Sequence, residues 1–374
     1  MRTFLAAMLA FLAVTSRLAA QSCADSATAF RRIVSEFQSR QKNVAISVGV
    51  MSNGRVVFAE ATGLINREAH IAPTVDTRFG IASATKAFTG MALLQLVEQG
   101  KIDLDAEIQT YVPEFPRNSQ GPVTVRELAA HFGAIRHWGR ERNDSLYARH
   151  FDNVMDILPL FSGNAFAGQP GVRYQYSSYG YNLLGMAIQR ASGVPYQKFV
   201  QDNVLTPLEL NTVAFDRPGM DGRARPVRYS WYDLKDFHDL TDSAVTVPDW
   251  DYSHNMAAGD LVSSVVDLLK FARAVRSPGF LNQASWALLW QRPKFGEVES
   301  PMSFGWFVRD NPARLGIGGS NAGLQSGVTV WKDQDLVVAA LANSWGSGSR
   351  SGEFMSDAGD GLLGRLAAVC GVTP

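Results

Sequence analysis

The order of hydrophobic and polar residues predicts a β-hairpin near the start of the chain and further strands near its end. Val44–Met51 and Arg55–Ala61 are β-type runs, and the Ser52-Asn53-Gly54 between them contains Asn-Gly, a strong hairpin signal. The same patterning returns late in the chain, in Phe304–Arg309, Gln325–Trp331 and Leu336–Asn343. We therefore expect both ends of the chain to build one β-containing lobe.

Helical patterns fill the middle of the chain and its two ends. Ala82–Gln99 is predicted to be a helix, and Gly100 follows it, where helices commonly end. Further helices are expected over Thr124–His131, Tyr179–Ala191, Tyr196–Val204 and Ser263–Val275, with amphipathic helices over Asp25–Gln41 and Gly361–Val369. These patterns predict an α/β lobe, residues 24–80 and 277–374, that carries an inserted, mainly helical lobe, residues 81–276.

The first twenty residues have the pattern of a signal peptide. Arg2 supplies a positive charge, Phe4–Val14 is an apolar run, and Leu18-Ala19-Ala20 places small residues before Gln21. The apolar run is too short to span a bilayer, which needs about 20 residues. We expect export to the periplasm or the exterior, with residues 21–374 forming a single domain. A buried N-terminal helix is the alternative.

The two cysteines lie near opposite ends of the expected mature chain. They are Cys23 and Cys370. In an oxidising compartment two such thiols can form a disulfide, which would bring the two terminal helices side by side. Two independent free thiols are the alternative.

Composition and charge narrow the class of protein. Of the 374 residues, 46% are hydrophobic and 19% charged, and 35 Lys and Arg balance 35 Asp and Glu. A net charge of zero argues against a general nucleic-acid binder, which needs clustered cations. No repeat of fixed period is present. We expect a soluble globular protein without stable membrane insertion, whose oligomeric state the sequence does not indicate.

Two common hydrolase motifs are missing. The chain contains neither the nucleophile elbow G-x-S-x-G nor the zinc signature H-E-x-x-H. His131 and His137 lack a third partner for a metal and are interpreted as structural. We predict no metal ion and no cofactor.

An S-x-x-K pattern occurs twice, in different surroundings. Ser39-Arg40-Gln41-Lys42 lies among charges at the polar end of a helix and is interpreted as chance. Ser83-Ala84-Thr85-Lys86 opens the helix predicted over Ala82–Gln99. Ser83 then lies at a helix N-terminus, where the helix dipole favours an oxyanion. The spacing places Lys86 one turn later on the same face.

The surroundings of Lys86 are apolar. It is the only charged residue between Arg78 and Glu98. Desolvation lowers the pKa of a lysine in such a place, which makes the amine available as a base for Ser83. The alternative is a surface lysine on a helix that happens to follow a serine.

A second candidate segment precedes the helix predicted over Tyr179–Ala191. The stretch from Tyr174 to Ile188 contains four tyrosines and no charge. A phenol near an ammonium can lose its proton early, so Tyr176 is a candidate base or proton relay. The alternative is a tyrosine-rich turn before a buried helix.

Together these segments resemble the serine β-lactamase and penicillin-binding-protein-like family. They are nearest to class C β-lactamases, their esterase and peptidase relatives, and the mitochondrial β-lactamase-like type. The similarity runs in the family's order over roughly residues 44–343, through Gly100–Asp105, Tyr111–Phe115, Val123–Leu128, Ile135–His137, Leu205–Leu208, Ala257–Ala272, Gly305–Phe307 and Leu336–Asn343. It implies a β-lactamase/transpeptidase-like α+β fold, in which N- and C-terminal helices flank an antiparallel sheet.

The resemblance also implies roles for three residues. Ser83 would be the acylated nucleophile, Lys86 its base partner and Tyr176 the tyrosine of the Y-x-N motif. Ser178 stands where that motif usually has asparagine, so the substrate-binding amide is missing.

The third motif departs further from the family. Where relatives have K-T-G or H-x-G, this chain has Gly316-Ile317-Gly318-Gly319, without a cation. The backbone N–H groups of Ser83 and Gly319 can still form an oxyanion hole, since this role needs no side chain. Gly318 is expected beside the substrate. Arg314 is a candidate replacement cation if the register of the strand is undisturbed.

These expectations combine into one function. We expect an exported serine hydrolase that forms an acyl-enzyme on Ser83 with ester, amide or peptide substrates. Esters and short peptides are favoured over β-lactams, because a β-lactam's carboxylate needs the missing cation. The alternatives are a catalytically impaired relative that binds cell-wall or peptide ligands, and a true β-lactamase or D,D-peptidase.

Overall fold

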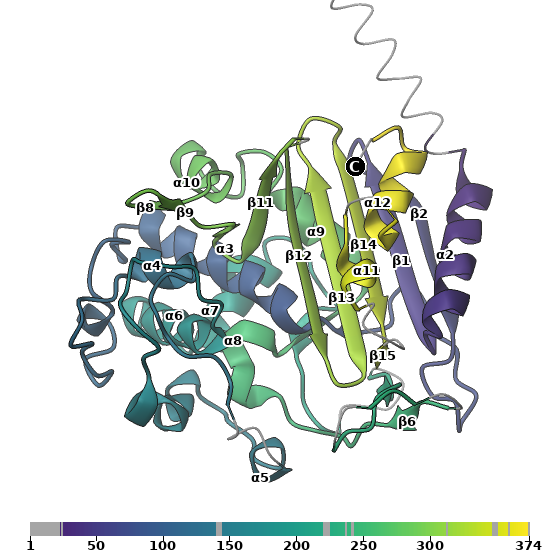
Figure 1. Ribbon diagram of the computed structural model, residues 1–374. Helices are drawn as coiled ribbons and strands as arrows, with labels where there is room; N and C mark the ends of the chain where they lie inside the picture. Colours follow the sequence, from purple (N-terminus) through teal and green to yellow (C-terminus); the bar gives the residue numbers. More distant parts are fainter. Residues whose placement is uncertain are drawn as a thin grey trace, which may run out of the picture.

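A seven-stranded antiparallel sheet forms the centre of the computed structural model (Figure 1). The structure describes residue 23 and residues 25–139, 144–219, 225–235, 238–240, 243–311, 313–345, 351–357 and 360–372, so the expected signal peptide lies outside the described residues. The strand order is β10-β11-β12-β13-β14-β1-β2. The strands are β1 Ala45–Ser52, β2 Arg55–Gly63, β10 Met302–Ser303, β11 Trp306–Asp310, β12 Ala313–Asn321, β13 Leu324–Trp331 and β14 Leu336–Ala342.

The hairpin and the late strands that the sequence pattern predicts are present as β1, β2, β11, β13 and β14. The pairing of β14 with β1 joins the late strands to the early hairpin. The pattern did not indicate β12, which contains three glycines, Gly316, Gly318 and Gly319. Glycine has a low strand propensity, and its side chain adds nothing to a hydrophobic pattern.

Helices cover both faces of this sheet. α2 (Ala27–Gln41), α11 (Ser351–Met355) and α12 (Leu362–Val369) lie on the face turned to the viewer in Figure 1, and α9 (Val265–Ala274) lies behind it. Gly49 lets α9 approach β1 closely, since a Cβ there would lie 2.7 Å from Leu269 Cδ1. The expected α+β architecture is confirmed.

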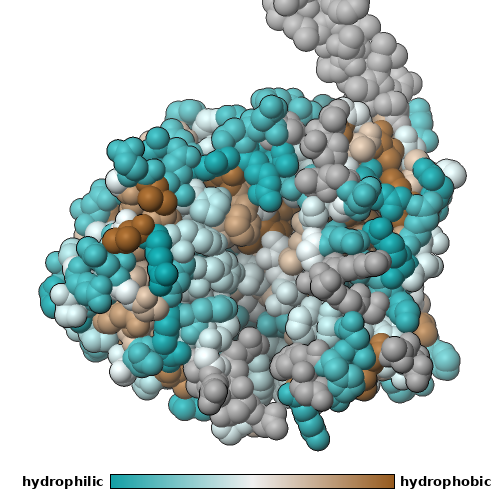
Figure 2. Space-filling model, viewed as in Figure 1, coloured by the Kyte–Doolittle hydropathy of each residue, from teal (hydrophilic) through white to brown (hydrophobic). Residues whose placement is uncertain are grey.

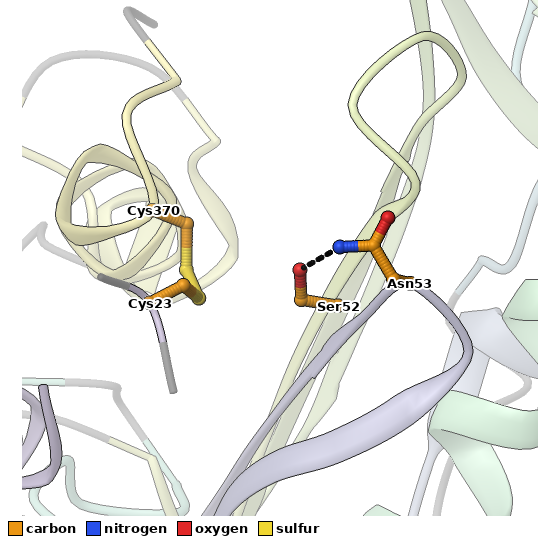
Figure 3. The surroundings of a disulfide bond; sticks show 4 residues. All are labelled: Cys23, Ser52, Asn53 and Cys370. Atoms are coloured by element: carbon orange, nitrogen blue, oxygen red, sulfur yellow. Dashed lines mark hydrogen bonds between the residues drawn. A yellow bond between two sulfur atoms is a disulfide. The ribbon is translucent and has the colours of Figure 1, made fainter. Parts of the chain in front are cut away.

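A disulfide connects the two terminal helices. Cys23 and Cys370 are bonded, and α2 lies against α12 as the pairing requires. The bond is near the β1–β2 turn, where the Asn53 amide donates a hydrogen bond to Ser52 Oγ at 3.1 Å (Figure 3). The prediction that the two thiols pair is confirmed.

The remaining helices form a cluster beside the sheet, with α3 at its centre. α3 (Thr85–Glu98) is buried on nearly all sides and contacts α6 and α8, which explains why its sequence has no polar face. The other helices are α4 Val125–Ala129, α5 Asp144–Tyr147, α6 Ser178–Ser192, α7 Tyr196–Val200, α8 Met256–Gly259 and α10 Gln283–Leu289. A capping box between Thr124 and Glu127 begins α4.

Short strands and turns complete the described chain. The strands are β3 Phe79–Gly80, β4 Ala214–Phe215, β5 Tyr229–Ser230, β6 Val245–Thr246, β7 Leu261–Ser263, β8 Lys294–Phe295, β9 Val298–Glu299 and β15 Ser344–Trp345. The turns are η1 Ala82–Ala84, η2 Ile108–Thr110, η3 Val154–Leu160, η4 Ser162–Asn164, η5 Gln201–Leu205 and η6 Ser253–Asn255. β3 leads into η1 and α3, so it delivers Ser83 to the junction of the sheet and the helical cluster.

Candidate active site

Ser83 and Lys86 lie at the start of α3, facing each other. Ser83 is part of η1, the 3₁₀ turn directly before the helix, and is partly exposed. Lys86 Nζ lies 3.3 Å from Ser83 Oγ. Ala82, just before Ser83, has a φ of 43°. A left-handed conformation is costly for alanine, and strain of this kind is concentrated at functional sites.

The Lys86 side chain is completely buried. Its Nζ contacts two further oxygen atoms, Ser178 Oγ at 3.1 Å and the Ala258 carbonyl at 2.8 Å. No acidic side chain takes part in these contacts, and burial lowers the pKa of the Lys86 ammonium well below its usual range. Burial therefore disfavours the charged form of the amine beside Ser83.

The Ala258 carbonyl is held in place by contacts between helices. Asn182 on α6 accepts a hydrogen bond from the Ala257 amide at 3.2 Å and donates one to the His254 carbonyl at 3.0 Å. Thr89 on α3 donates to the Ala257 carbonyl at 2.6 Å. These buried bonds fix α8 relative to Lys86, and no sequence motif had indicated them.

Tyr176 lies on the other side of the lysine, just before α6. Its ring centroid is 4.9 Å from Lys86 Nζ, and its hydroxyl is hydrogen-bonded to Ser83. Burial raises the pKa of Tyr176 to about 12, although the Ser83 bond opposes this. The expectation that this phenol loses its proton early is therefore wrong. Burial also disfavours the charged form of the neighbouring Lys86, the charge that would favour a phenolate.

Ser178, the first residue of α6, is oriented inward. It is 1% exposed, and its hydroxyl accepts the hydrogen bond from Lys86. The structure thus places Ser178 against the lysine rather than at the surface of the site. Its role as a substrate-binding group, expected from the Y-x-N motif, has no support in this position.

β12 runs past Ser83 at very short range. A Cβ on Gly319 would lie 2.4 Å from the Ile81 carbonyl oxygen and 2.5 Å from the Ser83 backbone nitrogen. Only glycine permits this approach. The structure therefore brings together Ser83, Lys86, Tyr176, Ser178 and Gly319 from three separate parts of the chain.

Gly318 and Arg314 face the other way. A Cβ on Gly318 would contact Met355 of α11, and Arg314 shares that face because side chains alternate along a strand. Arg314 is 5% exposed, and its Nε donates to Asp357 Oδ2 at 3.0 Å. The strand register is regular, as the prediction required, but this face does not include Ser83. The expectation that Arg314 replaces the motif's cation is therefore wrong.

A cavity of about 290 Å³ adjoins this part of β12. Phe307, Ile317 and Met355 give it apolar walls, and Arg309 and Asp357 line it as well. In Figure 2 hydrophobic surface is visible in a central hollow, where Figure 1 shows β11 and β12. Arg309 lies 3.6 Å from Asp357, the carboxylate that also binds Arg314. The sequence pattern did not single out Arg309, because its position near Asp357 depends on the pairing of β11 with β12.

The described part of the chain has neither a metal-binding cluster nor a membrane-spanning helix. No cluster of three His, Cys, Asp or Glu side chains there is arranged to hold a metal ion. No helix there is long and apolar enough to cross a membrane.

The fold is that of the β-lactamase and penicillin-binding-protein class of serine hydrolases. A family model described as "Beta-lactamase" matches residues 30–359, and the chain belongs to this family. The resemblance inferred from the sequence is confirmed.

Curated relatives are similar over part of their length. The human serine beta-lactamase-like protein LACTB, mitochondrial, is 27% identical over 328 residues, which cover 66% of this chain and 58% of LACTB. Protein flp of Staphylococcus aureus is 27% identical over 186 residues, 49% of this chain and 37% of flp. The chain thus spans less than two thirds of these relatives.

Solved structures share the fold over nearly the whole chain. D-amino acid amidase from Ochrobactrum anthropi SV3 has a TM-score of 0.77 at 21% identity, covering 91% of this chain and 98% of the amidase. An octameric penicillin-binding protein homologue from Pyrococcus abyssi has a TM-score of 0.74 at 24% identity, covering 92% and 77%. The hydrolase EstCE1 has a TM-score of 0.70 at 19% identity, covering 94% and 99%.

Proposed function

We propose that this protein is an exported serine hydrolase that forms an acyl-enzyme on Ser83. The observation that carries the proposal is the buried Lys86 amine, 3.3 Å from Ser83 Oγ and without an acidic partner. A neutral amine has two N–H donors and one lone pair. The two donors match Ser178 Oγ and the Ala258 carbonyl, and the lone pair is left for the Ser83 hydroxyl.

The hydrogen-bond chain accounts for each proton. Ser83 Oγ attacks the substrate carbonyl while its proton passes to Lys86 Nζ. The backbone N–H groups of Ser83 and Gly319 stabilise the oxyanion that forms. The carbon–leaving-group bond then breaks, and the leaving group takes the Tyr176 hydroxyl proton, while the protonated Lys86 balances the charge of the transient phenolate. Water then gives a proton to the phenolate and attacks the acyl ester, and Lys86 returns its proton to Ser83 Oγ as the ester bond breaks.

Tyr176 acts in this scheme as a neutral relay. Its hydroxyl is hydrogen-bonded to Ser83, and Lys86 Nζ lies 3.3 Å from Ser83 Oγ, which puts the three groups in series. A pKa of about 12 keeps the proton on the tyrosine at neutral pH. The phenol can then give up a proton and regain one without existing as a phenolate between turnovers.

The proposed substrates are esters, amides or short peptides without a carboxylate next to the scissile bond. The stretch Gly316-Ile317-Gly318-Gly319, which stands where relatives carry K-T-G or H-x-G, has no cation, and Arg314 is held on the far face by Asp357. These features favour a neutral substituent.

We further propose that residues 1–20 direct export and that residues 21–374 act as one catalytic domain. The Cys23–Cys370 disulfide supports an oxidising destination, the periplasm or the exterior, because such bonds persist there.

Covalent labelling tests the proposal. The mature protein is treated in parallel with a fluorophosphonate and with a fluorescent penicillin, and adducts are located by peptide mass spectrometry. Ser83→Ala removes the proposed nucleophile. Ser39→Ala is the matched control, because Ser39 belongs to the second S-x-x-K pattern and is exposed on α2.

We expect a fluorophosphonate adduct on Ser83 that persists in Ser39→Ala and disappears in Ser83→Ala. Labelling by penicillin as well would refute the proposed substrate preference and identify a carboxylate-binding cation such as Arg309. Absence of any adduct on Ser83 in folded protein would refute the hydrolase and leave a ligand-binding relative.

A further inference from the structure

Two histidines hold successive peptide groups of the segment that carries Tyr176. The Ser177 amide donates to His131 Nδ1 at 3.1 Å, and the Ser178 amide donates to His137 Nδ1 at 3.1 Å. The His131 carbonyl also accepts a bond from the Gln175 amide at 2.7 Å. The peptide groups on both sides of Tyr176 are thus fixed by imidazole or backbone acceptors from one loop, residues 131–137.

The same two imidazoles pack against the Tyr176 ring. The centroid of His131 is 4.4 Å from that of Tyr176, with the planes tilted by 31°. The centroid of His137 is 5.5 Å away, with the planes nearly perpendicular at 82°. A side chain restrained by rings and by the backbone bonds beside it keeps one rotamer, which is how a reacting group is held in place.

His131 is a costly residue at its position. It is 2% exposed, and its Nε2 has no hydrogen-bond partner among the described residues. Because Nδ1 accepts a bond, Nε2 carries the proton, and a buried N–H without a partner destabilises a fold. Its φ of 59° adds backbone strain. A leucine would avoid this orphaned N–H but would leave the buried Ser177 amide without its acceptor, so the contribution of the histidine at this position is its Nδ1 atom.

We propose that His131 and His137 are positioning residues that hold Tyr176 and Ser178 against Ser83 and Lys86. The proposal rests on the proposed function, since it assigns these histidines to the same site. Neither residue reacts with the substrate. Each acts through an Nδ1 atom that accepts a backbone N–H, so each must be neutral with its proton on Nε2. Loss of an acceptor would let the segment shift, moving the Tyr176 hydroxyl from Ser83 and Ser178 Oγ from Lys86.

Paired substitutions separate the acceptor from the rest of the imidazole. Asparagine places its Oδ1 near the position of His Nδ1, so His131→Asn and His137→Asn keep an acceptor for the two amides. His131→Leu and His137→Leu remove it. The readouts are the rate of fluorophosphonate labelling and kcat and KM for p-nitrophenyl butyrate, with the Ser83→Ala background subtracted.

His70 provides a matched control for the backbone. It is exposed and has a φ of 53°, close to that of His131. Asparagine tolerates this conformation better than leucine, so His70→Asn and His70→Leu report the backbone effect alone. Both should retain wild-type labelling rates, and their difference in Tm corrects the comparison at His131.

We expect each leucine variant to lose at least tenfold in labelling rate and kcat, with KM changed less than threefold. Each asparagine variant should stay within about fivefold of the wild type. The two leucine changes together should cost less than the product of their separate effects, because they release one segment. Equal rates in leucine and asparagine variants of equal Tm would overturn the proposal.

A spectroscopic readout keeps this test independent of the hydrolase. In ¹⁵N-histidine NMR spectra, His131 and His137 should both show the neutral Nε2–H tautomer at neutral pH. A proton on Nδ1 of either residue would refute the proposed positioning role of His131 and His137, whether or not Ser83 is labelled. Absence of wild-type labelling with the expected tautomers would instead refute the proposed function, while the hydrogen bonds from the two amides to the histidines would remain supported.

Discussion

Substitution of Gly319 by alanine offers a sharp test of the oxyanion site. The added Cβ would lie 2.4 Å from the Ile81 carbonyl oxygen, 2.5 Å from the Ser83 nitrogen and 2.9 Å from Ala82 Cβ. The first two are backbone atoms of the turn that carries the nucleophile, so no flexible side chain can move aside. The strand and the turn must therefore separate by about 1 Å to reach ordinary contact distances.

A separation of this size should greatly reduce catalysis and moderately reduce stability. Displacing a catalytic group by about 1 Å costs on the order of 100-fold in rate, and losing one oxyanion donor costs about 100- to 1,000-fold. We expect Gly319→Ala to lower kcat/KM by about 100- to 1,000-fold. Overpacking at a tight contact should lower the free energy of unfolding by about 1–3 kcal/mol.

Gly318→Ala is the control on the opposite face of the same strand. Its Cβ would meet Met355, with Sδ at 2.5 Å, Cγ at 2.7 Å and Cβ at 2.8 Å. Met355 is only partly buried and belongs to the short helix α11, so the displacement should fall on that helix rather than on the turn that carries Ser83, and activity should stay within about threefold of the wild type. The assay combines fluorophosphonate labelling, p-nitrophenyl butyrate hydrolysis and thermal unfolding. Wild-type activity in Gly319→Ala, or an equal loss in Gly318→Ala, would refute the assignment of Gly319 to the oxyanion site.

Three further predictions concern Lys86, Tyr176 and the disulfide. Lys86→Met should abolish labelling of Ser83 yet raise the free energy of unfolding. Lys86 binds its proton more weakly in the folded than in the unfolded chain. The free energy of unfolding of the wild type therefore rises as the pH approaches 10.5, by up to about 1.4 kcal/mol per pH unit. The difference in free energy of unfolding between Lys86→Met and the wild type becomes smaller by the same amount. A pH-independent advantage in denaturant titrations would contradict a neutral lysine. Tyr176→Phe should lower kcat by about 100- to 10,000-fold, and the ultraviolet difference titration against wild type should show one tyrosinate forming near pH 12; ionisation near pH 10 would contradict the neutral relay. Replacing Cys23 and Cys370 by serine should lower the free energy of unfolding by at most about 6 kcal/mol, because the bond closes a loop of 347 residues, while leaving kcat unchanged. Detection of two thiols in unreduced wild-type protein would contradict the bridge.

Hydrophobic patterning was sufficient for the regular elements with strong periodicity. β1, β2, β13 and β14 are nearly continuous apolar or alternating runs, and α3 is apolar with a glycine after it, so local signals and tertiary burial agree. β12 is the exception. Its glycines are required by contacts with α11 and η1, which lie far away in sequence. Local strand propensity therefore does not predict β12.

The candidate site also contains some features that follow from local sequence and others that depend on tertiary contacts. Ser83 and Lys86 are one helical turn apart, so their proximity follows from the spacing. The inward orientation of Ser178 and the pairing of Arg314 with Asp357 depend on which face of an element meets which neighbour. The high pKa of Tyr176 comes from its burial, which depends on the tertiary fold and not on the motif.

The contact between Gly319 and Ser83 also determines at which stage of synthesis and folding the proposed hydrolase becomes able to react. Ser83 emerges early from the ribosome and β12 only late, and the strand stands beside the turn once β13 and β14 have joined the early hairpin. A chain that is still being made, or is crossing a membrane unfolded, has the serine but lacks its oxyanion partner. Acylating capacity would therefore arise only with the finished fold, at the protein's destination.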